Sequence, residues 1–150
     1  MLVHKYYMNE ALKEARKAAK KNEVPIGAVI VYNDKIIARA HNLRVQKEET
    51  TAHAEILAIT KANKYLKSWR LEDCDIYVTL EPCAMCAGAI MQARMRAIYF
   101  AASDVKQGAL GGNFNLYQER FNHTIMINRG ILKEEAEELL QDFFKTLRGN

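Results

Sequence analysis

The chain has 150 residues, of which 49% are hydrophobic, and its 22 Lys and Arg against 18 Asp and Glu give a net charge of +4. This length and composition predict a single domain over residues 1–150 with a sizeable core, and the mild positive charge is compatible with a polyanionic partner without requiring one. The polar N-terminus and the short apolar runs argue against a signal peptide and a membrane span, so we expect a soluble cytoplasmic protein.

The N-terminal part of the chain predicts a helix followed by a β-hairpin. Apolar residues recur at i, i+3 and i+4 spacing from Met8 to Ala19, which indicates an amphipathic helix that ends near Asn22. Residues 24–32 are almost continuously apolar and rich in Val and Ile, as in a strand covered on both faces. A turn then leads to a second strand over residues 35–40, so we expect an antiparallel hairpin.

The middle of the chain predicts alternating helices and strands. Thr51 precedes an apolar run of helical length over residues 52–66, which predicts a helix capped by that threonine. Strands are predicted at residues 76–80 and 97–102, with a buried helix between them over residues 84–94. The order strand, helix, strand, helix, strand implies parallel neighbours joined by right-handed crossovers, with the hairpin as an antiparallel edge.

The C-terminal part predicts a long loop, a short strand and a closing helix. Residues 103–123 are polar with several Gly and Asn, and we expect this stretch to be a substrate-facing loop. Residues 124–127 predict a fifth strand. The closing helix carries an apolar stripe, which we interpret as core packing. The stripe consists of Ala136, Leu139, Leu140, Phe143, Phe144 and Leu147.

Two short motifs carry the residue types of a metal site, and each stands at the start of a predicted helix. Cys83 and Cys86 are three residues apart, so both sulfurs can face one ion, and a helix N-terminus favours the thiolate form that metals bind. His53 can supply a third, neutral ligand. Because zinc in proteins is usually four-coordinate, three protein ligands leave one position open for water, as in catalytic sites.

Glu55 stands close to His53 in the sequence and is suited to proton transfer. Zinc lowers the pKa of bound water from about 15.7 toward ~7, and a nearby carboxylate can take up the proton and pass it on. Positions i and i+2 of a helix interior point roughly 200° apart. His53 and Glu55 can therefore flank one metal ion only if they lie at the end of their helix.

Two other interpretations of the cysteine motif stay open. Cys-x-x-Cys between a strand and a helix also occurs in thioredoxin-like redox sites, although no proline follows Pro82 in this chain to line such a site. A structural zinc site would need a fourth ligand, for which Cys74, His41 or His123 are candidates, and it would leave Glu55 without a role. Taken alone, Cys74 is expected to be an inert residue before a strand, and the remaining histidines to be ordinary surface or loop residues.

His-x-Glu followed by Pro-Cys-x-x-Cys is the signature of zinc deaminases, in which these residues bind the metal and move the protons. Longer strings over nearly the whole chain resemble the bacterial tRNA-specific adenosine deaminases. The matching strings are Val24-Pro-Ile-Gly-Ala-Val29, Thr51-Ala-His-Ala-Glu-Ile56, Val78-Thr-Leu-Glu-Pro-Cys-Ala-Met-Cys-Ala-Gly-Ala89, Asp104-Val-Lys-Gln-Gly-Ala109 and Asp142-Phe143-Phe144. Such an extended match is far more specific than the short zinc motif alone.

This resemblance implies a cytidine-deaminase-like fold, a three-layer α/β/α sandwich around a mixed five-stranded sheet. It implies a homodimer that binds one Zn²⁺ per subunit through His53, Cys83 and Cys86. The implied reaction is the hydrolytic conversion of adenosine to inosine at the wobble position of a tRNA anticodon, with the anticodon stem-loop as partner. Water attacks C6 of a flipped-out adenine, while Glu55 protonates the ring nitrogen and assists the loss of ammonia.

The resemblance also implies which residues contact the substrate. Asn42 is expected to hydrogen-bond the target nucleotide and Asp104 to contact its sugar or backbone, where a 2′-OH contact would distinguish RNA from DNA. Ile26 and the Pro82-Cys83 backbone are expected to wall the pocket. For Asn42 and Asp104 the plain alternative is a polar loop residue that caps its own turn. Further RNA contacts are implied for Phe143, Phe144, Lys145 and Arg148.

Other functions stay open at this point. Guanine and free-nucleoside deaminases share the zinc chemistry and much of the fold, and guanine deaminases keep the histidine ligand, so only the pocket residues and loops separate them. Cytidine deaminases usually have cysteine in place of His53. A catalytically inactive, zinc-stabilised RNA-binding subunit is a further alternative, but such a protein would have no need for Glu55.

Overall fold

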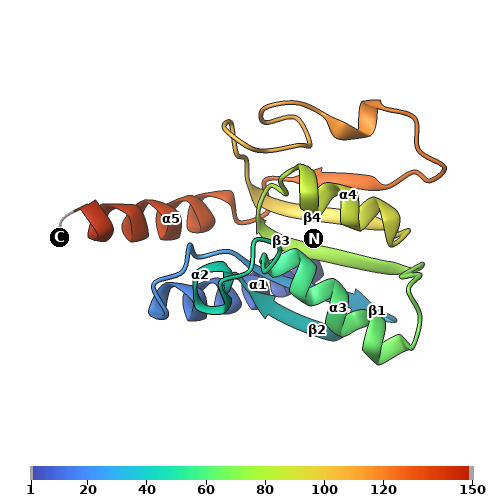
Figure 1. Ribbon diagram of the computed structural model, residues 1–150, viewed down its shortest axis with the longest axis horizontal. Helices are drawn as coiled ribbons and strands as arrows, with labels where there is room; N and C mark the ends of the chain where they lie inside the picture. The colour runs from blue at the N-terminus through green and yellow to red at the C-terminus, as the bar shows by residue number, and fades with distance from the viewer. Residues whose placement is uncertain (1, 149–150) are drawn as a thin grey trace.

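The computed structural model describes residues 2–148, which form a five-stranded sheet with helices on both faces (Figure 1). The strands lie in the order β2-β1-β3-β4-β5. Their bounds are Gly27–Tyr32 for β1, Lys35–His41 for β2, Cys74–Leu80 for β3, Ala97–Ala102 for β4 and Met126–Arg129 for β5. The helices are α1 (Leu2–Lys20), α2 (Arg44–Lys47), α3 (Ala54–Leu66), α4 (Ala84–Gln92), the 3₁₀ helix η1 (Leu116–Gln118) and α5 (Lys133–Arg148). Within residues 2–148, no helix is both long enough and apolar enough to cross a membrane.

The sheet mixes antiparallel and parallel strand pairs. β1 pairs antiparallel with both β2 and β3, whereas β3, β4 and β5 run parallel. The predicted hairpin and the parallel β3–β4 pair are confirmed, but β2 and β3 are not neighbours, since β1 lies between them. β1 is buried over nearly all of its length, while β2 is partly exposed. The more apolar strand of the hairpin therefore takes the interior position, where both of its faces are covered.

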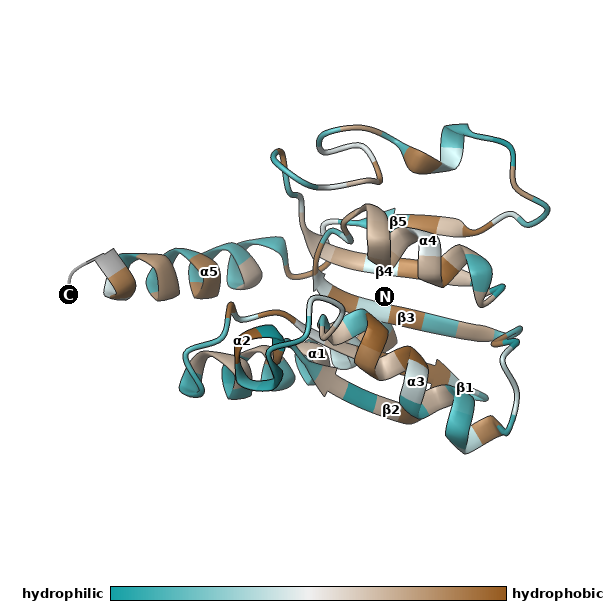
Figure 2. Ribbon diagram, in the orientation of Figure 1, coloured by the Kyte–Doolittle hydropathy of each residue, from teal (hydrophilic) through white to brown (hydrophobic). Residues whose placement is uncertain are grey.

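Helices cover both faces of the sheet and bury separate apolar clusters. On one face, α1 and α5 contribute Met8 and Ala136 to a cluster that includes Tyr77 of β3. On the other face, α3 and α4 contribute Ala58 and Ile90 to a second cluster. Figure 2 shows hydrophobic residues along β4 and alternating hydrophobic and hydrophilic residues along α5. These three layers are the α/β/α sandwich that the family resemblance implied.

The first strand begins later than predicted, at Gly27 instead of Val24. Pro25 has no N–H to donate to a neighbouring strand, which disfavours pairing at this point. The Ile26 N–H is bonded to the Val24 carbonyl at 2.8 Å, so the backbone turns there instead of extending. The segment before β1 is therefore free to line a cavity.

The helix predicted over residues 52–66 also begins later than expected. Thr51 does not cap it: the Thr51 carbonyl accepts the N–H of His53 at 2.8 Å in a tight turn, and His53 takes the N-cap position of α3. The other predicted strands and the helix over residues 84–94 lie within two residues of their expected bounds, whereas the N-terminal helix begins at Leu2, before the apolar pattern that starts at Met8. The tight turn matters for function because it frees the His53 side chain from helical periodicity.

The long stretch between β4 and β5 is mostly packed against the rest of the protein. Ala109 and Leu110 are fully buried. The Tyr117 hydroxyl donates to the Ala87 carbonyl at 2.8 Å, which anchors η1 to α4. Only residues 103–107 face the cleft described below, so the prediction of one continuous substrate-facing loop is wrong for the remainder.

Gly27 marks a close approach of β1 to α1, and this approach predicts an effect on stability. A Cβ atom at this position would lie 2.0 Å from the Ala11 carbonyl oxygen and 2.5 Å from the Ala15 nitrogen, both backbone atoms of α1. We expect Gly27→Ala to lower the free energy of unfolding by about 3 kcal/mol, because neither backbone segment can move alone. Urea denaturation of the two proteins measures the difference.

Gly88→Ala is the matched control for this substitution. A Cβ atom at Gly88 would meet nothing within 4 Å, and alanine is favoured over glycine in a helix by roughly 0.5–1 kcal/mol. We therefore expect Gly88→Ala to keep or raise the free energy of unfolding. Wild-type stability of Gly27→Ala would contradict the close approach of β1 to α1.

Candidate metal centre and substrate cleft

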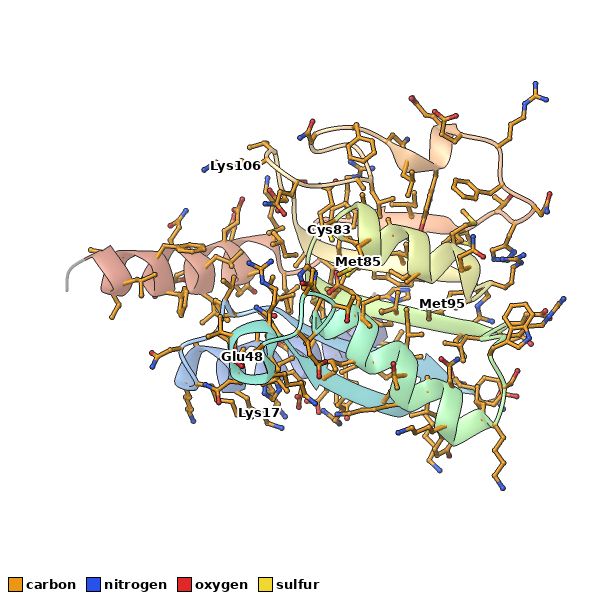
Figure 3. The ribbon with its side chains drawn as sticks, in the orientation of Figure 1. Lys17, Glu48, Cys83, Met85, Met95 and Lys106 are labelled. Atoms are coloured by element: carbon orange, nitrogen blue, oxygen red, sulfur yellow. The ribbon has the colours of Figure 1, made fainter. Side chains whose placement is uncertain are left out.

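Three potential metal ligands meet where α3 and α4 begin. His53 and Cys83 are the N-cap residues of α3 and α4, and Cys86 lies in the first turn of α4. Figure 3 shows Cys83 at the N-terminal end of α4. The His53 Nδ1 atom lies 3.7 Å from the Cys83 Sγ atom and 3.5 Å from the Cys86 Sγ atom, and all three ligand atoms are within 4.8 Å of one another. The residues predicted as ligands are thus brought together.

The separations in this group fit a tetrahedral zinc ion. With Zn–S bonds of about 2.3 Å and Zn–N bonds of about 2.0–2.1 Å, tetrahedral angles place a nitrogen and a sulfur ligand about 3.6 Å apart. The two N···S distances of 3.5 and 3.7 Å bracket that value. Two thiol sulfurs and an imidazole nitrogen also suit zinc far better than magnesium or calcium. The group can therefore hold a zinc ion with three protein ligands.

Hydrogen bonding within the group polarises its two thiols. The hydrogen bond from Cys86, joined by one from His53, lowers the pKa of Cys83 to about 3 against the opposing effect of burial. The same contact with Cys83, together with burial, raises the pKa of Cys86. The hydrogen bond with Cys83 raises the pKa of the His53 ring. A metal ion that binds here would release the protons that these groups share.

Glu55 is a buried carboxyl group beside the three ligands. It is the second residue of α3, and only 4% of its surface is exposed. Burial raises the pKa of Glu55 to about 7, although the charge of His53 and a bond to the Glu55 backbone act in the opposite direction. A carboxyl group with this pKa can both accept and donate a proton at neutral pH. The geometric condition set by the sequence is met, because His53 lies at the helix end.

A cleft of about 650 Å³ opens beside the ligand group. It lies at the carboxyl ends of β3 and β4, which is where ligands usually bind in open α/β sheets. Its walls come from the segment before β1, the segment after β2 with α2, the first residues after β4 and the C-terminal half of α5. His53, Ala54 and Leu80 line the cleft where it meets the metal ligands.

Asn42 and Asp104 both line this cleft, and both are hydrogen-bonded to nearby backbone. Asn42 donates from Nδ2 to the Val24 carbonyl at 3.4 Å and accepts the Arg44 N–H on Oδ1 at 3.2 Å. Asp104 accepts the N–H groups of Lys106 and Gln107 on Oδ1 at 3.0 and 3.1 Å. Asn42 and Asp104 each cap their own turn, which is the alternative that the sequence left open. Both side chains also line the cleft.

The C-terminal half of α5 forms one wall of the cleft instead of packing in the core. Ala136 is buried, as the predicted stripe requires, but Phe144 is 41% exposed and Leu147 is 59% exposed. Both residues line the cleft, as does Ile26 in the segment before β1. Figure 1 shows the reason, since α5 extends away from the sheet and leaves its distal turns without a core to cover.

Other residues near the C-terminus contribute less to the cleft. Phe143 lines it, whereas Lys145 is exposed and does not. The side chain of Arg148 lies outside the described residues. The interpretation of the stripe as core packing is therefore correct for the first turns of α5 and wrong for the last ones.

Two buried carboxylates that support the cleft were not singled out from the sequence. Glu23 is 1% exposed and accepts the N–H groups of Val45 and Gln46, so it caps α2 from outside that helix. Glu81 is 3% exposed and bonds to the loop after β4. Glu23 is only a charged residue next to an apolar run, which is too common to be decisive. Glu81 lies within the string Val78–Ala89 that resembles the family, but nothing local shows which loop its carboxylate bonds.

The remaining cysteine and histidines do not join the ligand group. Cys74 is fully buried in β3, and burial raises its pKa to about 11. His41 bonds to Glu14 at 3.0 Å and His123 to the Met95 carbonyl at 2.6 Å. Among residues 2–148, no other group of three or more His, Cys, Asp or Glu could hold a metal ion. The structure thus gives no support to a fourth protein ligand, and His53 favours a metal site over a dithiol redox pair.

A second hollow, of about 690 Å³, lies at the opposite, amino ends of β3 and β4. Its charged residues include Arg70, Arg94 and Arg96, and two of them pair with acidic residues. Arg70 bonds to Glu72 at 2.8 Å and Arg96 to Asp75 at 2.9 Å. None of the three potential metal ligands lines this hollow. We therefore take the cleft beside the metal ligands as the candidate substrate site.

Comparisons with known sequences agree with this geometry. The family model described as MafB19-like deaminase matches residues 2–148. The tRNA-specific adenosine deaminase of Bacillus subtilis (strain 168) is 54% identical over 95% of this chain and 89% of its own length. That of Rickettsia typhi (strain ATCC VR-144 / Wilmington) is 47% identical over 94% of this chain and 97% of its own length.

Comparisons with solved structures support the same fold. A structure from a study of A-to-I editing by tRNA:A34 deaminases at the wobble position of transfer RNA has a TM-score of 0.88 and 42% identity, covering 90% of this chain and 99% of its own. A guanine deaminase from Nitrosomonas europaea has a TM-score of 0.77 and 26% identity, covering 93% of this chain and 83% of its own.

Loss of a ligand predicts loss of the metal. We expect His53→Ala and Cys83→Ala to lose zinc, because the remaining pair of ligands cannot complete a tetrahedral site. Zinc is measured per chain after the proteins are passed through a desalting column. Cys74→Ala is the matched control: this thiol is buried outside the group, so its loss should leave the zinc content unchanged. Stoichiometric zinc in His53→Ala would place the metal elsewhere.

Proposed function

This chain belongs to the family of tRNA-specific adenosine deaminases, and we propose that it converts adenosine to inosine at the wobble position of a tRNA anticodon. The observation that supports this function most directly is the buried Glu55 carboxyl beside the group of His53, Cys83 and Cys86. Hydrolytic deamination needs a nucleophile at neutral pH, a proton carrier and a pocket for the base. The ligand group, Glu55 and the cleft supply places for all three.

The metal that suits this group is one zinc ion per chain, held by His53, Cys83 and Cys86. Support comes from the two sulfur ligands and one nitrogen ligand and from the distances between them. When bound, zinc supplies a water molecule whose pKa is lowered to about 7, and thus a nucleophile at neutral pH.

Glu55 carries out the proton transfers. Its carboxylate takes a proton from the attacking water and delivers it to N1 of adenine as the C6–O bond forms. A second proton from the same oxygen then passes through Glu55 to the C6 amino group, which leaves as ammonia when the C6–N bond breaks. Water and adenosine thus give inosine and ammonia, and Glu55 returns to its starting state. The pKa of about 7 suits a group that must work in both directions.

The cleft is suited to a nucleotide that is turned out of the anticodon loop. Its volume of about 650 Å³ falls in the usual range for small-molecule pockets, roughly 300–1,000 Å³. Ile26 and Leu80 provide apolar walls for a base, and the Phe144 ring is exposed at the α5 wall, where a base can stack on it. We assign Ile26 and Phe144 to substrate binding on these grounds.

Asn42 and Asp104 keep hydrogen-bonding capacity for the substrate. The Asn42 carboxamide has two N–H donors and two acceptor positions, and its two local bonds use one of each. Both local bonds of Asp104 end on Oδ1, which leaves Oδ2 to accept from a ribose hydroxyl. We therefore assign Asn42 to the target nucleotide and Asp104 to its sugar.

The tRNA anticodon stem-loop is the partner that follows from this reaction, and the proposed setting is the cytoplasm. We further propose a homodimer, as the family resemblance implies. Light scattering of the purified protein measures the number of subunits, and a monomer at all concentrations would contradict the homodimer.

The function is tested by inosine formation on an anticodon stem-loop with adenosine at the wobble position. Free adenosine, guanine and cytidine are assayed in parallel with the zinc-loaded protein. We expect turnover of the stem-loop, and replacement of Glu55 by Gln should reduce it by about a thousandfold, since a positioned proton carrier contributes roughly 10²–10⁴ in rate. Glu55→Gln keeps the size of the side chain, so its zinc content and stability should match the wild type.

The possible outcomes of this assay separate the alternatives. Turnover of guanine alone would keep the zinc chemistry and favour the substrate of the Nitrosomonas europaea relative. Turnover of no substrate by zinc-loaded wild type would favour the inactive RNA-binding subunit. Retained activity in Glu55→Gln would contradict the proposed mechanism whatever the substrate.

If Asp104 contacts the ribose 2′-OH, then replacing Asp104 and removing that hydroxyl should have effects on KM that do not multiply. We expect Asp104→Asn to raise KM for the RNA stem-loop by about tenfold, because it weakens a bond to a charged acceptor. A stem-loop with 2′-deoxyadenosine at the wobble position should show a similar rise with the wild type and little further rise with Asp104→Asn. If the two changes instead multiply their effects, Asp104 does not contact that hydroxyl.

A further inference from the structure

Glu81 is a buried carboxylate close in the chain to both the ligand group and the cleft lining, and it belongs to neither. It follows the last residue of β3 and stands two residues before Cys83. Its side chain is 3% exposed, and it is neither a member of the ligand group nor a lining residue of the cleft. A buried carboxylate needs hydrogen-bond donors, so the partners of Glu81 indicate its role.

Within residues 2–148, every donor to the Glu81 side chain is a backbone N–H group of one loop. Oε1 accepts from Asp104 at 3.1 Å, and Oε2 accepts from Leu110 and Gly112, each at 2.9 Å. The backbone beside Glu81 holds the same loop, since the Ala109 N–H donates to the Pro82 carbonyl at 3.0 Å. The segment 104–112 is thus folded around one carboxylate.

Two glycines make this close wrapping possible. A Cβ atom at Gly108 would lie 2.3 Å from Glu81 Oε2 and 2.4 Å from the Asp104 carbonyl oxygen. A Cβ atom at Gly112 would lie 2.6 Å from Glu81 Oε1 and 2.2 Å from the same Asp104 oxygen. Larger residues would push the loop off the carboxylate, so the glycines of this stretch serve the bond to Glu81.

The part of the loop that begins at this carboxylate is the part that faces the cleft. The Asp104 N–H is bonded to Glu81, and the Asp104 side chain then accepts the N–H groups of Lys106 and Gln107, so the turn is built outward from Glu81. Figure 3 shows Lys106 on this loop and Cys83 at the start of α4. Both residues lie at the end of the sheet from which α5 extends.

We propose that Glu81 is a positioning residue for RNA: its carboxylate fixes the 104–107 turn relative to Cys83, and so sets Asp104 at a defined place in the cleft. This inference rests on the proposed function, because it takes Asp104 as a contact to the target nucleotide. Displacement of such a contact by about 1 Å can lower the reaction rate by up to about a hundredfold. Glu81 acts through Asp104 and does not itself touch the substrate.

Glu81→Gln is the sharpest substitution because it keeps the shape and removes one acceptor atom. If the amide nitrogen takes the place of Oε1, two donors face each other at Asp104. If it takes the place of Oε2, the N–H groups of Leu110 and Gly112 both lose their acceptor. At least one of the three bonds is therefore lost in either orientation.

The first test measures the loop itself by amide hydrogen exchange in zinc-loaded protein. We expect Glu81→Gln to speed exchange at Asp104, Leu110 and Gly112 by about tenfold, while the zinc content stays at that of the wild type. Unchanged exchange at all three amides would overturn the proposal. Loss of zinc with unchanged exchange would also overturn it, since Glu81 would then serve the metal-binding turn.

The second test measures turnover of the anticodon stem-loop. We expect Glu81→Gln to raise KM by about tenfold and to change kcat less, as a displaced binding contact should. In the background of Asp104→Ala, Glu81→Gln should have little further effect on KM. Effects that multiply in the double variant would overturn the proposal, because they would show general destabilisation instead of positioning through Asp104.

Two further variants keep the test decisive. Gly112→Ala disturbs the same bonds from the loop side and should reproduce both effects even if Glu81→Gln folds poorly. Glu10→Gln removes another buried carboxylate, on α1 outside the cleft, and should change neither loop exchange nor KM. If wild-type protein fails to turn over the stem-loop, the proposed function fails, whereas the exchange measurement still decides whether Glu81 holds the loop.

Discussion

Packing of α3 and α4 side by side on one face of the sheet is the contact on which the reaction centre depends. The residues directly before them, His53 and Cys83, are the N-caps, and a side chain at an N-cap is not bound to helical periodicity. The two helix starts therefore bring an imidazole and two thiols within 4.8 Å, although 30 residues separate His53 from Cys83. The exposed N–H groups of helix N-termini also favour the anionic sulfur that a metal requires.

Three buried glutamates near the cleft show how environment assigns different tasks to one side chain. Glu23 and Glu81 are surrounded by backbone N–H groups, and they tie α2 and the 104–112 loop to the two sides of the cleft. Glu55 lies beside the group of His53, Cys83 and Cys86, where burial raises its pKa to about 7. A carboxylate that accepts several N–H bonds stabilises a loop, while one with a pKa near neutrality can move protons.

The cleft itself is assembled from segments that are distant in sequence, and this limits what could be predicted of it. Ile26, Asn42 and Asp104 were expected there because the chain resembles a known family, and the structure places all three in the lining. Phe144 illustrates the limit, since its place in an amphipathic stripe is equally consistent with a core or a cleft wall. The difference depends on where α5 leaves the sheet, which no local pattern records.

The sequence by itself determined the positions of nearly all helices and strands and the identity of the chemical groups, because periodicity and residue type act over short range. It also set the condition that His53 and Glu55 must lie at a helix end. Only the tertiary structure decided that β1 lies between β2 and β3, that the last turns of α5 face the cleft, and that Glu81 holds the loop of Asp104. Each of these depends on contacts between residues far apart in the sequence, which bury apolar surface or satisfy buried polar groups. Such contacts exist only in the folded chain.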